Sequence, residues 1–265
     1  MADPESPNTG GIALIGWSLG GIHVLALLAY LDALPGNTQS ILQKYLHTVL
    51  CHGEVVVCLI TQVLRTHMRF LSDASAIALG IPNTPKHSIS LWSETDVRKR
   101  FDAFFDWASA HYIHKSVMSE NLDDLEFNNP SSDIPHSFDA LSYTQRAEYT
   151  DIKAFSPDGC DGKLLFCDTT AFAVLTRRAL FDKACAEKLP NVRVRFMSGG
   201  TSAGALVWAL WMLREYVDNP PEVLYGRNAE KARDIQFITH TEGNHFIFWE
   251  DPEKAIQQFT AAISL

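Results

Sequence analysis

Short apolar runs alternate with amphipathic segments along most of this chain. Three apolar runs bounded by turn residues have the length and composition of buried strands: Ile12–Ile15, Val192–Met197 and Ile235–Thr239. Between and after them, apolar residues recur at helical spacing, and we expect helices over residues 22–34, 40–49, 94–111, 169–188, 207–216 and from 251 onward. Strands separated by helices predict an α/β fold with a mostly parallel sheet flanked by helices.

The stretch from residue 85 to residue 162 is more polar than the rest and carries helical patches between turn clusters. Phe101, Phe104 and Trp107 share one helix face, whereas residues 128–133 have the composition of a loop. Such a block between sheet elements suits a helical cap over an active site. We therefore divide the chain into a first part of the core (1–84), a helical cap (85–162) and a second part of the core (163–265).

Composition narrows the class of protein. The 265 residues are 46% hydrophobic, enough to bury a sizeable core. A formal net charge of −9 argues against nucleic acid or an anionic membrane as the main partner. The five cysteines are an odd number in a chain with no secretory signal, so a reduced, cytoplasmic setting is expected. Only His52 lies near the pair Cys51 and Cys58, so no metal site is expected.

The most specific motif is Gly16-Trp17-Ser18-Leu19-Gly20, which lies between the first predicted strand and the first predicted helix. In that context, G-x-S-x-G is typical of a nucleophile elbow, in which a serine is held on a strained strand-to-helix turn. The flanking glycines lack a Cβ and permit such a turn. At a helix N-terminus, backbone N–H groups and the helix dipole favour developing negative charge. Ser18 is therefore the candidate nucleophile.

Two other interpretations of this stretch remain open. Residues 11–31 are mostly apolar and nearly long enough to cross a bilayer, and Gly16 with Gly20 spells a helix-packing G-x-x-x-G. However, Trp17 and Ser18 interrupt the run and acidic rather than basic residues precede it, so no membrane span is expected. The other interpretation is a Gly/Ser turn in an ordinary core.

A serine nucleophile needs a base to accept its proton and an acid to orient that base. His245 follows the last predicted strand, in a turn opened by Gly243 and Asn244 and before the final helix. That loop can bring an imidazole over the sheet edge toward Ser18. The alternative is a solvated loop histidine.

These two motifs, at residues 16–21 and 243–246, stand in the order and at the places found in the α/β-hydrolase superfamily, and Phe248–Glu253 looks like the start of its C-terminal helix. The chain resembles this superfamily over nearly its whole length. The resemblance implies that Ser18 is the nucleophile, that His245 is the base and that the Leu19 N–H is the first oxyanion donor. The motifs do not specify a substrate. We interpret the chain as an esterase-like serine hydrolase for a small apolar substrate, and no cofactor is implied because the serine and histidine supply the chemistry.

The resemblance leaves the acid less well defined. Most members carry it in a Gly-x-x-Asp turn after the penultimate strand, but here Ser202 stands at the position of the aspartate. A hydroxyl does not stabilise an imidazolium as a carboxylate does. Some members place the acid one strand earlier, where Asp73 fits and gives the family order Ser18, Asp73, His245. The alternative role for Asp73 is a helix N-cap or turn residue.

The chain departs from the family pattern in two respects. About ten residues precede the nucleophile strand, where the family usually has three or four strands and the second oxyanion donor. We therefore expect an N-terminally truncated hydrolase fold, and a catalytically impaired remnant or binding module is the alternative function. Residues 49–69 also have no place in the pattern. They are interpreted as a translated intron or similar gene-model error, or as a genuine insertion with its own short strand at Val55–Ile60.

Overall fold

Four parallel strands form a single sheet at the centre of the computed structural model, which describes residues 11–53, 96–156, 158–165 and 169–264. The strands lie in the sheet in chain order: β1 (Ile12–Trp17), β2 (Leu46–His52), β3 (Arg193–Gly199) and β4 (Ile235–His240). Because neighbouring strands are parallel, each connection must cross back over the sheet, and helices provide these crossings. All four carboxyl ends consequently meet at one edge of the sheet.

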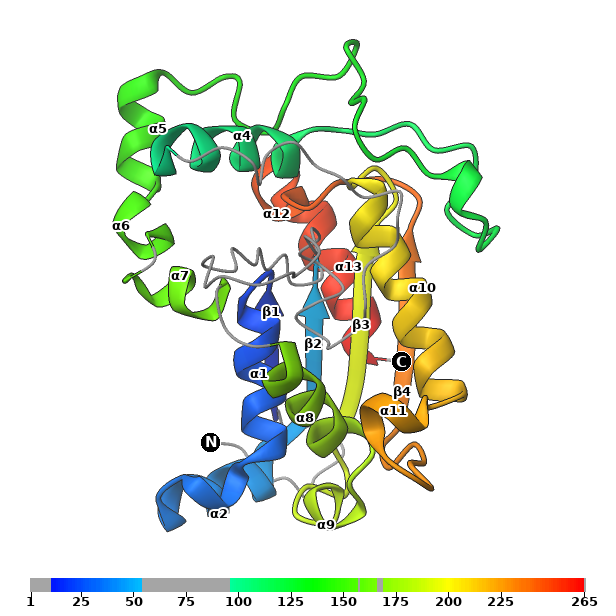
Figure 1. The fold of residues 1–265 in the computed structure, drawn as a ribbon. Coiled ribbons are helices and arrows are strands. Elements are labelled where there is room, and N and C mark those ends of the chain that lie inside the picture. The colour runs from blue at the N-terminus through cyan, green and yellow to red at the C-terminus, as the bar shows by residue number, and fades with distance from the viewer. Residues whose placement is uncertain (1–10, 54–95, 157, 166–168, 265) are drawn as a thin grey trace, which may run out of the picture.

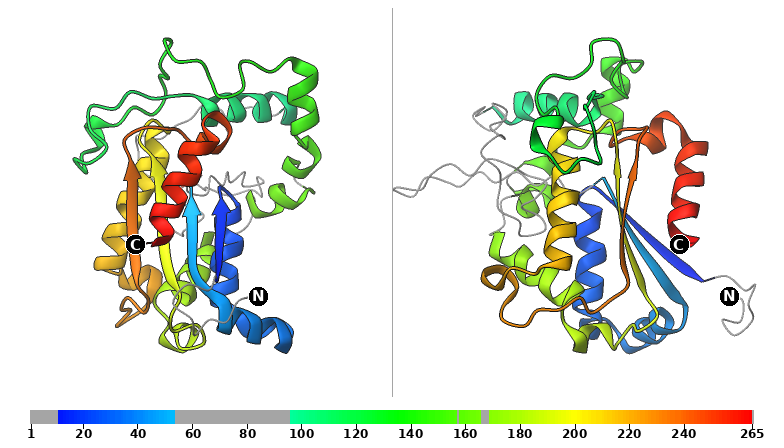
Figure 2. Two further views of the ribbon diagram at one scale, coloured as in Figure 1. Left: turned by 180° about the vertical axis from the view of Figure 1, so that it is seen from behind. Right: turned by 90° about the vertical axis from the view of Figure 1, so that its right-hand side faces the viewer.

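Helices cover both faces of this sheet. Figure 1 shows α1, α8 and α10 in front of the strands, and the side view in Figure 2 shows α13 on the opposite face. The helical elements are α1 (Gly20–Ala29), η1 (Leu31–Ala33), α2 (Gly36–Tyr45), α4 (Val97–Ser109), η3 (Leu122–Asp124), α5 (Tyr143–Tyr149), α6 (Ile152–Phe155), α7 (Cys160–Leu165), α8 (Thr169–Leu180), α9 (Lys183–Ala186), α10 (Gly204–Asp218), α11 (Glu222–Tyr225), α12 (Ile247–Glu250) and α13 (Pro252–Ser264). The predicted α/β class with a parallel sheet flanked by helices is confirmed.

Burial follows the position of each strand in the sheet. Val194 and Phe196 of β3 belong to the large core under α1, α8 and α10, while Leu50 and Met197 pack with Ala262 of α13 on the other face. These strands are apolar almost throughout because helices cover both of their faces. Strand β1 differs. It pairs with β2 on one side, no other described strand lies on its second side, and its Ile15 is 44% exposed.

Three predicted helix boundaries were wrong. The helix expected over 22–34 ends at Ala29 and is followed by the short helix η1. The helix expected over 40–49 ends at Tyr45, and Leu46–His52 form β2 instead. Pairing with β1 on one side and β3 on the other satisfies the backbone of this segment and outweighs its helical periodicity. The predicted helix over 169–188 is broken after Leu180, and Asp182 caps the short helix α9 by accepting from the Cys185 N–H at 3.2 Å.

The region predicted as a cap, 85–162, contains α4, η3, α5, α6 and the start of α7. Figure 1 shows α4 lying beyond the carboxyl ends of the strands, close to α12. Aromatic contacts join this region to α12: the ring centroids of Phe105 in α4 and of Phe138, between η3 and α5, lie 6.0 and 4.8 Å from that of Phe246, the N-cap residue of α12. The domain boundaries themselves, and the insertion assigned to 49–69, stay predictions. Residues 49–52 of that segment lie in β2.

Candidate active site

The turn between β1 and α1 holds Ser18 in an uncommon backbone conformation. Its φ is +52°, in the left-handed region that non-glycine residues seldom occupy. The Ser18 N–H donates to the His52 carbonyl at 3.0 Å, and its own carbonyl accepts from the Gly21 N–H at 2.9 Å. Ser18 is thus held at the carboxyl edge of the sheet, at the start of helix α1. Such a strained serine is the conformation that the motif predicts.

The two glycines of the motif are not equivalent. A Cβ on Gly16 would lie 2.5 Å from the Gly20 carbonyl oxygen, so the chain passes too closely there for any side chain. A Cβ on Gly20 would meet nothing within 4 Å. The expectation that the serine needs neighbours without a Cβ therefore holds for Gly16. At position 20 the structure shows no steric clash that would exclude a side chain, so it does not explain why this residue is glycine.

The backbone N–H of Leu19 is available to a ligand. Leu19 is the N-cap residue of α1, and its N–H donates to no residue in the described part of the chain. Free N–H groups at a helix N-terminus can donate hydrogen bonds to an anionic oxygen. This is the environment that an oxyanion donor needs.

His245 lies at the same edge of the sheet as Ser18. The loop after β4 turns at Gly243, whose φ is +92°, and buries His245 to 2% exposure. Trp17, the neighbour of Ser18, donates from Nε1 to the His245 carbonyl at 2.9 Å, and the two ring centroids are 5.2 Å apart. The fold therefore brings together the strand end that carries Ser18 and the loop that carries His245. Their side chains share no hydrogen bond, as far as the described residues go.

The imidazole of His245 has a buried nitrogen without a partner. Its Nδ1 makes no hydrogen bond with any described group, and it lies 2.5 Å from the position that a Cβ on Gly53 would occupy. Burial, with the nearby His52, lowers the pKa of His245 to about 3. His245 is therefore neutral at physiological pH, and the same burial makes it a weaker base than an ordinary histidine. The candidate acid, Asp73, lies outside the described residues.

His52 was missed as a site residue by sequence reasoning. It is the last residue of β2 and is fully buried, its ring packs edge-on against Phe259, and neither ring nitrogen has a described partner. Burial, with His240 nearby, lowers its pKa to about 4, while a weaker interaction with the Met197 backbone acts in the opposite direction. The sequence gives no signal for this position, because residues 40–49 were expected to be helical and no strand ending at His52 was predicted.

The turn predicted to lack an acid packs beside the loop of His245. The Thr201 N–H donates to the Gly243 carbonyl at 3.1 Å, and the Ser202 hydroxyl is buried without a described partner. No carboxylate is supplied by this turn. Among the described residues, no group of histidine, cysteine and carboxylate side chains is arranged to hold a metal ion. No helix in the described ranges is both long enough and apolar enough to cross a bilayer.

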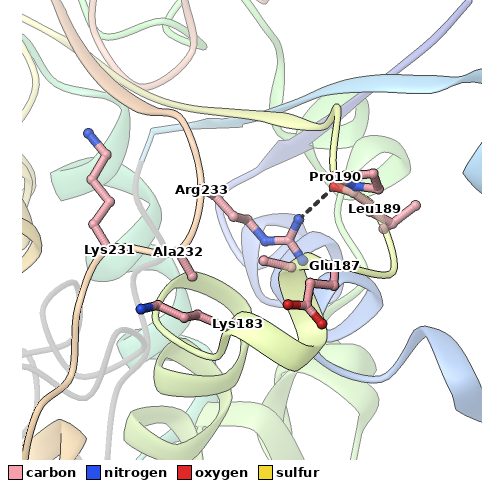
Figure 3. A pocket seen from close by; sticks show the side chains of 8 residues that line it. Lys183, Glu187, Leu189, Pro190, Lys231, Ala232 and Arg233 are labelled. Atoms are coloured by element: carbon pink, nitrogen blue, oxygen red, sulfur yellow. Dashed lines mark hydrogen bonds between the residues drawn. The ribbon is translucent and has the colours of Figure 1, made fainter.

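A cavity of about 330 Å³ lies at the opposite end of the sheet, beside α9 (Figure 3). Its cations already have partners: Lys183 pairs with Glu230 at 3.1 Å, and the Arg233 guanidinium donates to three backbone carbonyls. This cavity has no nucleophile and lies away from Ser18. Its lining residues are Lys183, Ala186, Glu187, Leu189, Pro190, Lys231, Ala232 and Arg233.

No protein-family model matches the chain, and no curated protein sequence matches it. Two solved structures are similar. Epoxide hydrolase I of potato (Solanum tuberosum) has a TM-score of 0.36 and 14% identity, with 98% of this chain and 72% of that chain covered. A point mutant of potato epoxide hydrolase has a TM-score of 0.36 and 15% identity, with coverages of 97% and 71%. At this level of similarity, an activity has to be inferred from the site itself.

Proposed function

We propose that this protein is a serine hydrolase of the α/β-hydrolase superfamily that cleaves a small apolar ester. The observation that carries the proposal is the left-handed Ser18, at a strand-to-helix turn whose edge of the sheet also holds His245. A residue in a strained conformation persists only where the surrounding structure imposes it, and such residues cluster at functional sites.

The proposed reaction follows from these groups. His245, which is neutral, accepts the Ser18 proton as the hydroxyl oxygen attacks the ester carbonyl carbon. The oxygen of the tetrahedral intermediate, now negatively charged, accepts a hydrogen bond from the Leu19 N–H. The intermediate collapses to an acyl-enzyme, and the alcohol leaves with the proton from His245. Water then releases the acid by the same steps. No cofactor is needed.

We further propose Asp73 as the acid that orients His245. Two observations support a carboxylate from this part of the chain. The Nδ1 of His245 is buried without a described partner, and it lies against Gly53, the residue at which the chain leaves β2 toward Asp73. An imidazole whose Nδ1 donates to a carboxylate is fixed in the tautomer that accepts a proton at Nε2.

A second candidate function is a catalytically impaired hydrolase fold that only binds. Two observations favour it: the Ser18 and His245 side chains share no hydrogen bond in the described structure, and the described residues offer no carboxylate to His245. A serine without an engaged base is a weak nucleophile.

Labelling with a fluorophosphonate probe separates the two candidates. We expect wild type to be labelled and Ser18→Ala not, with hydrolysis of a short p-nitrophenyl ester lost in parallel. Asp73→Asn should lower the labelling rate strongly while leaving the circular dichroism spectrum unchanged. Folded wild-type protein that neither labels nor hydrolyses the ester would favour the binding module.

A further inference from the structure

Asn244, the residue before His245, is the centre of a buried hydrogen-bond network. It is 0% exposed, and its side-chain nitrogen lies 3.0 Å from the Ser109 carbonyl, 2.9 Å from the Ser137 hydroxyl and 3.1 Å from Glu250 Oε1. Glu250 Oε1 also lies 2.6 Å from the Ser137 hydroxyl and 2.8 Å from His111 Nε2. These groups belong to three separate parts of the chain.

The donors and acceptors of this network can be assigned consistently. His111 Nε2 lies closest to Glu250 and donates to it, and the Ser137 hydroxyl donates to the same carboxylate oxygen. One Asn244 N–H then donates to the Ser109 carbonyl, and the other is shared between the Ser137 hydroxyl oxygen and Glu250 Oε1. Every member has a partner, and such fully satisfied buried networks favour a single arrangement. Burial alone would raise the pKa of Glu250, but the hydrogen bonds from His111, Ser137 and Asn244 lower it below its usual value.

The network joins the helical region above the sheet to the loop of His245. Ser109, His111 and Ser137 belong to the segment that carries α4, whereas Asn244 and Glu250 lie before and at the end of α12. The partners of Asn244 are far away in sequence: Ser109 is 135 positions distant and Ser137 is 107. A displacement of α4 would therefore act, through the hydrogen bond between Ser109 and Asn244, on the residue directly before His245.

The same side chain also closes the backbone around His245. Asn244 Oδ1 accepts from the Phe246 N–H at 2.8 Å, so the residues before and after His245 are tied together. The His245 carbonyl is held by Trp17 Nε1. The imidazole itself makes no hydrogen bond to any group in the described ranges, so these backbone bonds, with packing, set its direction.

We propose that Asn244, supported by Glu250, is a positioning residue that aims His245 and makes its position depend on the segment carrying α4. The catalytic consequence rests on the proposed hydrolase function. The structural consequence does not, since it concerns only the His245 ring and its surroundings.

The test replaces Asn244 by its closest analogue. Asn244→Asp keeps the shape of the side chain but removes both N–H donors and places a second carboxylate beside Glu250. The matched control is Asn219→Asp, because Asn219 donates to Glu215 at 3.0 Å on the exposed end of α10, away from the site. Ser137→Ala removes one link without any charge and serves as a milder variant if Asn244→Asp does not fold.

Two measurements are made on each folded variant. The pH titration of the His245 ring, followed by NMR, reports its position. We expect the ring in wild type and Asn219→Asp to stay neutral from pH 5 to 8, and the ring in Asn244→Asp, and in part in Ser137→Ala, to titrate within that range. The fluorophosphonate labelling rate reports function, and we expect a loss of at least 10-fold in Asn244→Asp with the control unchanged.

The outcomes are separable. If no variant labels, wild type included, the proposed function fails, while the NMR titration still decides whether Asn244 positions the ring. If Asn244→Asp and Ser137→Ala both fold and retain the wild-type titration of His245, the positioning role is overturned. If the ring titration changes in Asn244→Asp and labelling by an active wild type does not, the catalytic consequence is overturned.

Discussion

The two loops that carry the candidate catalytic residues are held in different ways. The turn of Ser18 is shaped mainly by its own neighbours: Gly21 donates to the Ser18 carbonyl, and Gly16 leaves space for Gly20. One bond from outside, from the Ser18 N–H to the His52 carbonyl, joins it to β2. The loop of His245 depends on distant residues, among them Trp17, 228 positions away. A short sequence motif can determine a conformation that depends on neighbouring residues. A loop that is stabilised by residues far away in the sequence takes its conformation from the rest of the fold. The first loop is expected to tolerate changes elsewhere, and the second is not.

Removing the Ser18 side chain should have the largest effect on activity and little effect on stability. In Ser18→Gly the left-handed φ becomes unstrained, which offsets the greater flexibility of glycine in the unfolded chain. We expect ester hydrolysis to fall by roughly 10⁴-fold or more. Steady-state kinetics and urea unfolding measure both quantities. Retention of more than a tenth of the activity would exclude Ser18 as the nucleophile.

The next largest effect tests the local turn. Gly16→Ala forces a Cβ to within 2.5 Å of the Gly20 carbonyl oxygen, and we expect a loss of about 1–3 kcal/mol in the free energy of unfolding. Gly20→Ala is the matched control, since its Cβ meets nothing within 4 Å and alanine favours the helix by about 0.5–1 kcal/mol. Urea unfolding of both variants measures their free energies of unfolding. Equal stabilities would show that the turn is not sterically tight.

Acid should weaken the loop of His245 rather than the turn of Ser18. Burial lowers the pKa of His245 to about 3 and that of His52 to about 4, against 6.5 for an ordinary histidine. The unfolded chain binds more protons below pH 6.5, so the stabilising contribution of the neutral rings is complete above that pH and declines as the pH falls toward 4. Urea unfolding from pH 7 to pH 5 should show this decline.

Two variants sharpen the pH test. His245→Gln should flatten the decline in stability between pH 7 and pH 5, because one buried titrating group is removed. The same substitution at His23, whose side chain is exposed on α1, serves as the control. An unchanged slope in His245→Gln would mean that the ring is not buried as a neutral group in solution.

The smallest expected effect concerns His52. Neither buried ring nitrogen makes a hydrogen bond of good geometry to a described group, although the Met197 backbone lies close to the ring, and burying an unsatisfied polar group costs about 1–3 kcal/mol. We expect His52→Leu to be more stable than wild type by about 1 kcal/mol, because an apolar side chain can still pack against Phe259. Thermal unfolding at pH 7 measures the difference. A destabilised variant would indicate that His52 has a polar partner.

Much of the fold followed from the pattern of apolar residues. The strands at Ile12–Trp17, Arg193–Gly199 and Ile235–His240 were expected within a few residues, because short apolar runs bounded by turns have few other uses. Strand β2 was not. Its residues Leu46–Val49 continue the periodicity of the preceding helix, and their strand conformation depends on partners on both sides. Strand pairing between segments far apart in the chain cannot be predicted from the residue pattern of either segment alone.

The candidate site also has one part that could be predicted from the sequence and one part that only the folded structure determines. The strained turn at Ser18 could be predicted because the residues that create it, Gly16 to Gly21, are contiguous and act through local sterics. The burial of His245, its unpartnered Nδ1 and the support from Asn244 and Glu250 come from elements brought together by folding. Their energies arise from desolvation and from long-range hydrogen bonds, which depend on the packed structure rather than on neighbouring residues.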